Sequence, residues 1–234
     1  MKIAVMADIH GNHFGLFQVL QQARNEQVEK LFILGDIVGY YYHPDKVMEL
    51  LSEWDYIFIK GNHEELLSKL LTGELDIKIL EEKYGSGHRA AISLLSSVQI
   101  EKLITSPEKL ILEIDSLKIL MCHGSPWDKN LYLYPDTDAK ILNIASEMGV
   151  DMVLIGHSHY QFLHSNKNTI LLNPGSVGQS RSTGGLADWA IIDTKNKVIQ
   201  LRSTLYDTTS LITEVVETDP ENAYLKNVLT RNRN

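Results

Sequence analysis

The chain has 234 residues, a formal net charge of −8 and a pI near 5.6. This acidic balance argues against a protein that grips long nucleic acid, because neutralising phosphates requires a basic face. With 44% hydrophobic and 22% charged residues the composition is that of a globular protein, and one domain spanning 1–234 is predicted.

Three strand-loop-helix units are predicted in the first third of the chain. They comprise strands over 3–7, 31–34 and 56–59, and helices over 14–27, 44–53 and 64–71. Strands that alternate with helices indicate parallel pairing with right-handed crossovers. Each strand ends at a polar motif, and open α/β sheets bind ligands at that edge.

The remaining chain predicts a helical segment and a second sheet. Residues 74–107 are predicted to be mostly helical, and to cover the site or set substrate choice. The later elements are strands over 109–114, 118–121, 152–155, 170–172, 189–193 and 198–205, and a helix over 138–148. Asp219-Pro220-Glu221 has the pattern of a cap, a first-turn proline and an acid, which predicts a last helix over 220–230.

Cysteine usage and the first residues bear on the compartment. The single cysteine, Cys122, cannot form an internal disulfide, which agrees with a reducing environment. The chain reaches Asp8 before a signal-peptide core could form, and no run approaches about 18 apolar residues. We therefore expect a soluble cytoplasmic protein that makes no contact with membranes.

Five motifs at predicted strand ends carry residue types that bind metals. They are Asp8-Ile9-His10, Gly35-Asp36, Gly61-Asn62-His63-Glu64, His123-Gly124 and Gly156-His157-Ser158-His159. Metals such as Mn²⁺, Fe²⁺ and Zn²⁺ take imidazole nitrogen and carboxylate oxygen together. A structural zinc site would normally use cysteine thiolates, whereas this set leaves coordination positions for water and substrate. The motifs therefore predict a catalytic metal site.

In this order the motifs resemble those of the calcineurin-like metallophosphoesterases, over about residues 1–205. The longer strings Ala7-Asp8-Ile9-His10-Gly11-Asn12 and Asn173-Pro174-Gly175-Ser176-Val177-Gly178 resemble the small bacterial and archaeal phosphoesterase branch. The resemblance implies an α/β fold, a four-layer α/β/β/α sandwich with two mixed β-sheets flanked by helices. It also implies a phosphoesterase with two divalent metal ions, Mn²⁺ first, with Fe, Ni or Zn as alternatives.

The same resemblance assigns roles to residues. One metal would be held by Asp8, His10, Asp36 and His159, and the other by Asp36, Asn62, His123 and His157. Asp36 would then bridge the two ions, and a hydroxide shared by them would attack phosphorus. His63 would be the catalytic residue that stabilises the transition state or protonates the leaving oxygen.

Three residues outside the metal set are expected to contact substrate. Arg181 can bind phosphate through two nitrogens, Tyr40 begins an aromatic run that could stack on a base, and His88 is the third. Each has a structural alternative. Arg181 could be an exposed loop arginine, Tyr40 could simply pack against the following helix, and His88 could be a buried histidine whose hydrogen bonds are satisfied. Protein phosphatases of this superfamily carry an arginine shortly after Gly-Asp, and its absence here disfavours phosphoprotein substrates.

Taken together, the sequence predicts a phosphodiesterase acting on a small phosphorylated, nucleotide-like substrate. Two alternatives stay open: a hydrolase of diadenosine polyphosphates, and a non-catalytic metal-binding scaffold. No partner of another kind is expected, neither long nucleic acid nor membrane, and a homodimer is left open.

Overall fold

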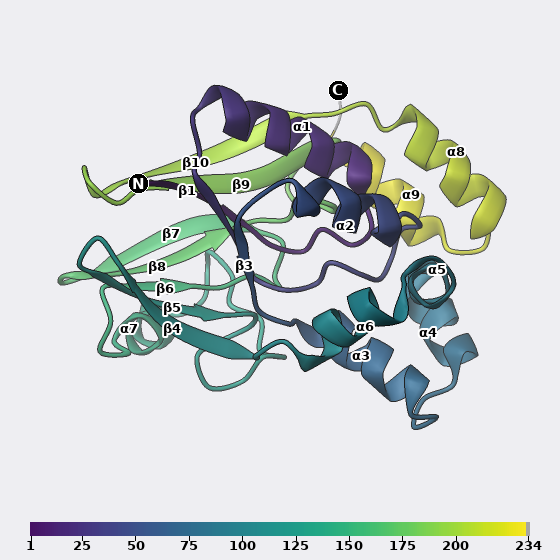
Figure 1. The fold of residues 1–234 in the computed structure, drawn as a ribbon, viewed down its shortest axis with the longest axis horizontal. Coiled ribbons are helices and arrows are strands. Elements are labelled where there is room, and N and C mark those ends of the chain that lie inside the picture. The colour runs from purple at the N-terminus through teal and green to yellow at the C-terminus, as the bar shows by residue number, and fades with distance from the viewer. Residues whose placement is uncertain (233–234) are drawn as a thin grey trace.

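The computed structural model describes residues 1–232 and confirms the predicted sandwich of two mixed sheets between helices (Figure 1). The first sheet contains β1 (Lys2–Met6), β2 (Lys30–Ile33), β3 (Tyr56–Phe58), β9 (Leu186–Asp193) and β10 (Val198–Leu205). The second contains β4 (Lys109–Ile114), β5 (Leu117–Cys122), β6 (Met152–Leu154), β7 (Gln161–Asn166) and β8 (Thr169–Pro174). Their strand orders are β10-β9-β1-β2-β3 and β4-β5-β6-β8-β7.

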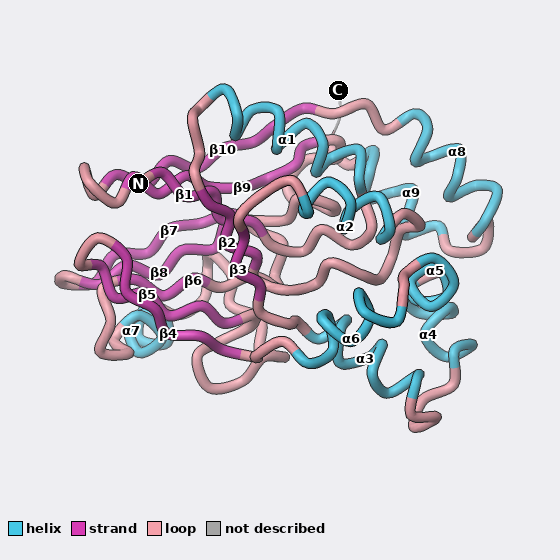
Figure 2. The backbone as a smooth tube through the Cα atoms, in the orientation of Figure 1, coloured by secondary structure: helices cyan, strands magenta, loops and turns pink. Residues whose placement is uncertain are grey.

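Helices cover the outer faces of the sheets and gather beyond one end of them (Figure 2). They are α1 (His13–Asn25), α2 (Pro44–Ser52), α3 (Asn62–Leu71), α4 (Ile77–Tyr84), α5 (Gly87–Leu94), α6 (Ser97–Thr105), α7 (Ala139–Ser146), α8 (Thr209–Thr218) and α9 (Ala223–Thr230). Buried side chains of α1 and α2 pack on the first sheet, and those of α7 pack on the second. The helical content predicted for 74–107 is found as α4, α5 and α6.

Alternate side chains of β1 pack into two different hydrophobic cores, one between the sheets and one under the helices. Ile3 and Val5 are fully buried in the core between the sheets, whereas Ala4 and Met6 are fully buried under the helices. Successive side chains of a strand point to opposite faces. Because both faces are covered, the strand is an uninterrupted apolar run, as in other buried sheets.

Strand register brings the polar motifs of both sheets to one end of the sandwich. β1 and β2 are parallel with Met6 opposite Ile33, so the loops that follow them run side by side. The Asp8 amide donates to the Gly35 carbonyl at 3.1 Å across those loops. In the second sheet β5, β6 and β8 are parallel neighbours, and their carboxyl ends carry the remaining motifs.

The last helix begins later than the sequence predicts. Residue 220 does not start it, because the Asp219 carboxylate accepts hydrogen bonds from Ser86 and from the Tyr42 hydroxyl at 2.7 to 2.9 Å. Asp219 instead follows α8, and Asn222 directly precedes α9. Neither α8 nor β7 is predicted by the sequence pattern.

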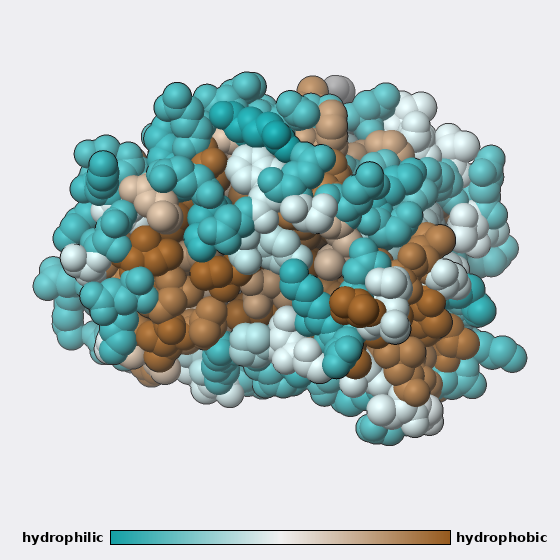
Figure 3. Space-filling model, in the orientation of Figure 1, coloured by the Kyte–Doolittle hydropathy of each residue, from teal (hydrophilic) through white to brown (hydrophobic). Residues whose placement is uncertain are grey.

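Apolar surface gathers over α4 to α6 and over the edge strand β4 (Figure 3). Its most exposed members include Val98 at 73%, Ile79 at 58% and Ile111 at 56%. None of the helices in residues 1–232 combines the length and hydropathy needed to cross a bilayer.

Candidate metal centre

The loops that carry the predicted ligands adopt a strained backbone. Five of the predicted ligands have positive φ: Asp8 (55°), His10 (52°), Asp36 (56°), His157 (66°) and His159 (61°). This left-handed region is unfavourable for residues with a Cβ atom, and such strain gathers at functional sites. β1 ends at Met6, so the geometry of the following loop, and not the alternation of a strand, aims the side chains of Asp8 and His10.

All seven predicted ligands and His63 converge on one buried cluster. Ligand atoms lie within 4.8 Å of one another in three groups: Asp8, His10 and His159; Asp36, His123 and His157; and His10, Asp36 and His63. Asn62 joins the second group, since its Oδ1 lies 2.9 Å from His123 Nε2. With Asn62, the first two groups contain the two ligand sets expected from the resemblance, except that Asp36 is missing from the first group. Asp36 lies with His10 in the third group instead.

The histidine tautomers show that the first group fits a cation. His10 Nδ1 lies 3.1 Å from the Val38 carbonyl and His159 Nδ1 lies 3.0 Å from the Gln179 carbonyl. A carbonyl can only accept, so both Nδ1 atoms carry the proton. The two Nε2 atoms, 3.1 Å apart, then present lone pairs to each other. Burial lowers the pKa of His10 to about 4, which keeps its ring neutral. A metal between the two rings would satisfy both nitrogens.

The second group shows the same need for a positive charge. His123 Nε2 faces the Asp36 Oδ2 atom at 3.2 Å and the Asn62 Oδ1 atom at 2.9 Å, and both oxygens are acceptors. Burial would lower the pKa of His123, but the Asp36 carboxylate outweighs it and the pKa rises to about 10. His123 is therefore protonated at the position where a metal ion would bind. Histidine ligands release this proton when the metal binds.

Glu64 is a functional residue that the sequence interpretation missed. Its carboxylate accepts hydrogen bonds from four backbone amides, those of Gly61 (2.8 Å), Asp36 (2.9 Å), Ile37 (2.7 Å) and Val38 (3.3 Å). Burial raises the pKa of Glu64 to about 7, and the amide donors oppose that rise. Glu64 therefore joins the loop after β2 to the start of α3. Its position as the third residue of α3, where glutamate closes a capping box, was the available signal.

His63 lies beside the cluster with its ring held on several sides. Its amide donates to Asp36 Oδ1 at 2.8 Å, and its ring is 4.8 Å from that of His10. Burial keeps the pKa of His63 well below its usual value, and its Nδ1 has no hydrogen-bond partner within residues 1–232. His88 stacks on it at 5.1 Å and is fully buried. His88 can therefore act on a substrate only through His63.

Two cavities meet at Arg181, beside the cluster. One of about 460 Å³ is lined by Tyr40 and Arg181, among others, and one of about 550 Å³ is lined by Tyr134 and Arg181, among others. The Tyr40 ring lies 4.6 Å from the ring of His10. Arg181 and Tyr40 thus line a cavity beside the cluster, and their contact with substrate stays a prediction.

The rest of the tyrosine run has a structural role. Tyr41 and Tyr42 are buried against α8 and α9, and the Tyr41 hydroxyl donates to the Leu225 carbonyl at 3.1 Å. Asn173, near the end of β8, also has a structural role, because its side chain donates to the Gly156 carbonyl at 2.8 Å.

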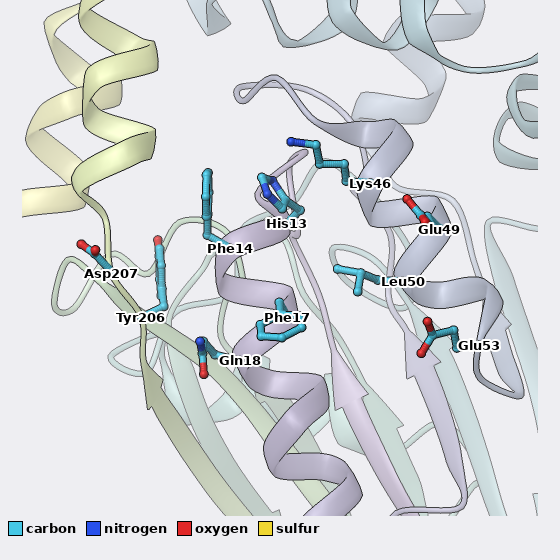
Figure 4. Close-up of a pocket in the computed structure, with 10 residues that line it drawn as sticks. All are labelled: His13, Phe14, Phe17, Gln18, Lys46, Glu49, Leu50, Glu53, Tyr206 and Asp207. Carbon is cyan, nitrogen blue, oxygen red and sulfur yellow. The ribbon is translucent and has the colours of Figure 1, made fainter.

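A further cavity of about 420 Å³ lies between α1 and α2 and is separate from the cluster. Figure 4 shows His13 and Phe14 of α1 on one side and Lys46 and Leu50 of α2 on the other. None of the predicted metal ligands lines it.

The sandwich of two mixed sheets is a fold that this chain shares with a solved metallophosphoesterase. The chain belongs to the calcineurin-like phosphoesterase superfamily, whose domain model matches residues 1–197. The family resemblance is thereby confirmed. The match ends before α8 and α9.

Relatives cover nearly the whole chain. It is 30% identical to the uncharacterized protein MJ0912 of Methanocaldococcus jannaschii over 92% of both chains. The crystal structure of hypothetical protein PH1004 from Pyrococcus horikoshii is similar with a TM-score of 0.82 and 20% identity, over 99% of this chain and 98% of that one. A metallophosphoesterase from Sphaerobacter thermophilus has a TM-score of 0.79 and 23% identity, over 98% of each chain. At these identities the two structures show a shared fold.

Proposed function

We propose that the protein is a two-metal phosphodiesterase that acts on small molecules in the cytoplasm. The buried convergence of all seven predicted ligands on one cluster carries this proposal. One ion would be held by Asp8, His10, Asp36 and His159, and the other by Asp36, Asn62, His123 and His157. When bound, such ions, Mn²⁺ first, supply an activated water and neutralise charge on the phosphoryl oxygens.

Residues of the chain would supply the remaining chemistry. His63 is neutral because burial depresses its pKa, so it can offer a ring N–H to an oxygen of the phosphoryl group. Arg181 lines the cavity beside the cluster, and its guanidinium can bind two phosphoryl oxygens in a fixed orientation. The two residues would hold the substrate while charge moves to the leaving oxygen.

The two cavities support a diester over a monoester. A phosphodiester carries an organic group on each of two oxygens, and both groups need space beside the phosphorus. Arg181 lies between cavities of about 460 and 550 Å³, so each side of the phosphate has room for one group. Tyr40 and Tyr134 offer flat apolar surface to those groups.

Turnover of bis-para-nitrophenyl phosphate tests this function. Protein stripped by chelator is expected to be inactive and to recover when Mn²⁺ is restored. The variant His63→Ala should lower kcat by about 10² to 10³ at unchanged metal content, which is the usual cost of removing one hydrogen-bond donor to the transition state. His164→Ala is the matched control, since its ring bonds Asn143 at 2.8 Å outside the cluster. Metal-independent turnover would contradict the proposal.

Gly39 provides a second test of His63. A Cβ atom at Gly39 would lie 2.1 Å from His63 Nδ1, so Gly39→Ala should displace that ring and lower kcat by about a hundredfold. Gly73 also has positive φ, but no atom lies within 4 Å of its Cβ position. Gly73→Ala therefore carries the same backbone strain without the collision. If both variants lose stability and only Gly39→Ala loses turnover, the position of His63 is what matters; equal turnover would contradict this.

Hydrolysis of dinucleoside polyphosphates is a second candidate function of the same site. Tyrosines favour it, because Tyr84 and Tyr132 line the smaller cavity and can stack on a nucleobase. Chromatography of products from diadenosine tetraphosphate separates the two candidates. Intact tetraphosphate under conditions that cleave aryl diesters would exclude the second.

A further inference from the structure

Three cations from distant parts of the chain line the smaller cavity beside the metal cluster. Lys83 lies at the end of α4, Arg181 on the loop after β8, and Arg231 directly after α9. No carboxylate of residues 1–232 lines this cavity, and no ion pair within that range involves the three cations. In a chain of net charge −8 such a concentration of positive charge indicates an anionic ligand.

Tyrosines that line the cavity pack on histidines of the cluster. Ring centroids lie 4.6 Å apart for Tyr40 and His10, 4.8 Å for Tyr84 and His63, and 3.9 Å for Tyr132 and His157. A group bound among the cations would therefore lie close to a phosphate at the cluster.

Arg181 has unused hydrogen-bonding capacity toward this space. Its Nε is buried and has no partner within residues 1–232, and its guanidinium lies 5.9 Å from the Tyr132 ring centroid. Arginine nitrogens stay protonated and can only donate, and a buried donor without an acceptor is unfavourable. A ligand oxygen would satisfy it.

The end of the chain holds the Arg181 loop in place. Arg231 Nη1 donates to the Arg181 carbonyl at 3.0 Å, and the Tyr224 hydroxyl donates to Gln179 Oε1 at 3.0 Å. Both anchoring residues come from the segment beyond the family match, which ends at residue 197. Residues outside the matched domain therefore help to shape the cavity.

We propose that this cavity binds a second phosphoryl group of the substrate, so that the preferred substrates are nucleoside polyphosphate esters. The inference rests on the proposed phosphoesterase function and names its substrate class. A simple diester has one negative charge, which the metal ions and Arg181 would neutralise. Lys83 and Arg231 match the additional charge of linked phosphates, and Tyr84 and Tyr132 match a base.

Variants of the two outer cations test the proposal against two substrates, diadenosine tetraphosphate and bis-para-nitrophenyl phosphate. Lys83→Gln and Arg231→Gln should each raise KM for the tetraphosphate at least about tenfold more than KM for the aryl diester. Arg231→Lys should restore part of the loss because it keeps the charge. Lys78→Gln on α4 and Lys226→Gln on α9 are matched controls, since neither lines the cavity. Equal changes for both substrates, or none, would overturn the proposal.

Calorimetry supplies a readout that does not need turnover. Tripolyphosphate should bind the chelator-stripped protein more tightly than orthophosphate, and Lys83→Gln and Arg231→Gln should weaken that binding at least about tenfold. If the protein cleaves no phosphoester but shows this binding pattern, the proposed function fails and the anion site stands. If aryl diesters are cleaved but tripolyphosphate binding is unaffected by the variants, the anion site fails alone.

Discussion

Asp36→Asn is expected to lower kcat/KM for bis-para-nitrophenyl phosphate by more than about a hundredfold, beyond the usual effect of residues outside the coordination sphere. The reason is that Asp36 serves both ligand groups: its Oδ2 is 3.2 Å from His123 Nε2 and 3.9 Å from His10 Nε2. Asparagine removes the negative charge and places an amide where an anionic oxygen stood. Steady-state kinetics together with metal analysis of the purified variant measure both consequences.

The control for Asp36→Asn is a carboxylate outside the cluster. Asp55 is 66% exposed and pairs with Lys30 at 2.7 Å, a surface ion pair of about 0 to 1 kcal/mol. Asp55→Asn should keep both metal content and turnover. If Asp36→Asn retained wild-type turnover with a full metal complement, the scaffold alternative would gain over the phosphodiesterase.

The cluster of candidate metal ligands was predictable because short sequence motifs contain the residue types that bind metals. Asp8, His10 and Asp36 each follow an apolar run, and a parallel sheet brings the ends of such runs together. Residue type and strand position thus sufficed to name all the residues that converge. The left-handed backbone that aims these side chains was not predictable, because it depends on contacts between loops far apart in sequence.

The anion site was less accessible to sequence reasoning. Arg181 was singled out through its motif, but Lys83 and Arg231 belong to no motif and are separated by 148 residues (231 minus 83). They meet only because α9 packs on the Tyr41 region and α4 lies beside it. A lysine or arginine on a helix usually lies on a solvated face, so composition alone gave no reason to select these two.

Glu64→Gln is expected to lower the free energy of unfolding by about 2 to 6 kcal/mol, since two buried amide donors lose their acceptor at about 1 to 3 kcal/mol each. The Gly61 and Asp36 amides both donate to Oε2 of Glu64. A glutamine NH₂ group in that position is itself a donor, so it could not accept a hydrogen bond from either backbone N–H. Metal affinity should fall as well, because these bonds fix the loop that carries Asp36. Denaturant unfolding of the stripped protein and metal titration measure the two effects.

Glu65 supplies the comparison for Glu64 in the next position of the same helix. Its carboxylate pairs at the surface with Lys69 at 2.8 Å and Lys129 at 2.7 Å, so Glu65→Gln should cost no more than about 1 kcal/mol. Equal losses for both variants would mean that the buried amide network contributes nothing particular. A large loss for Glu64→Gln alone would show that the loop after β2 is held in its strained, ligand-aiming conformation by a carboxylate that need not itself bind metal.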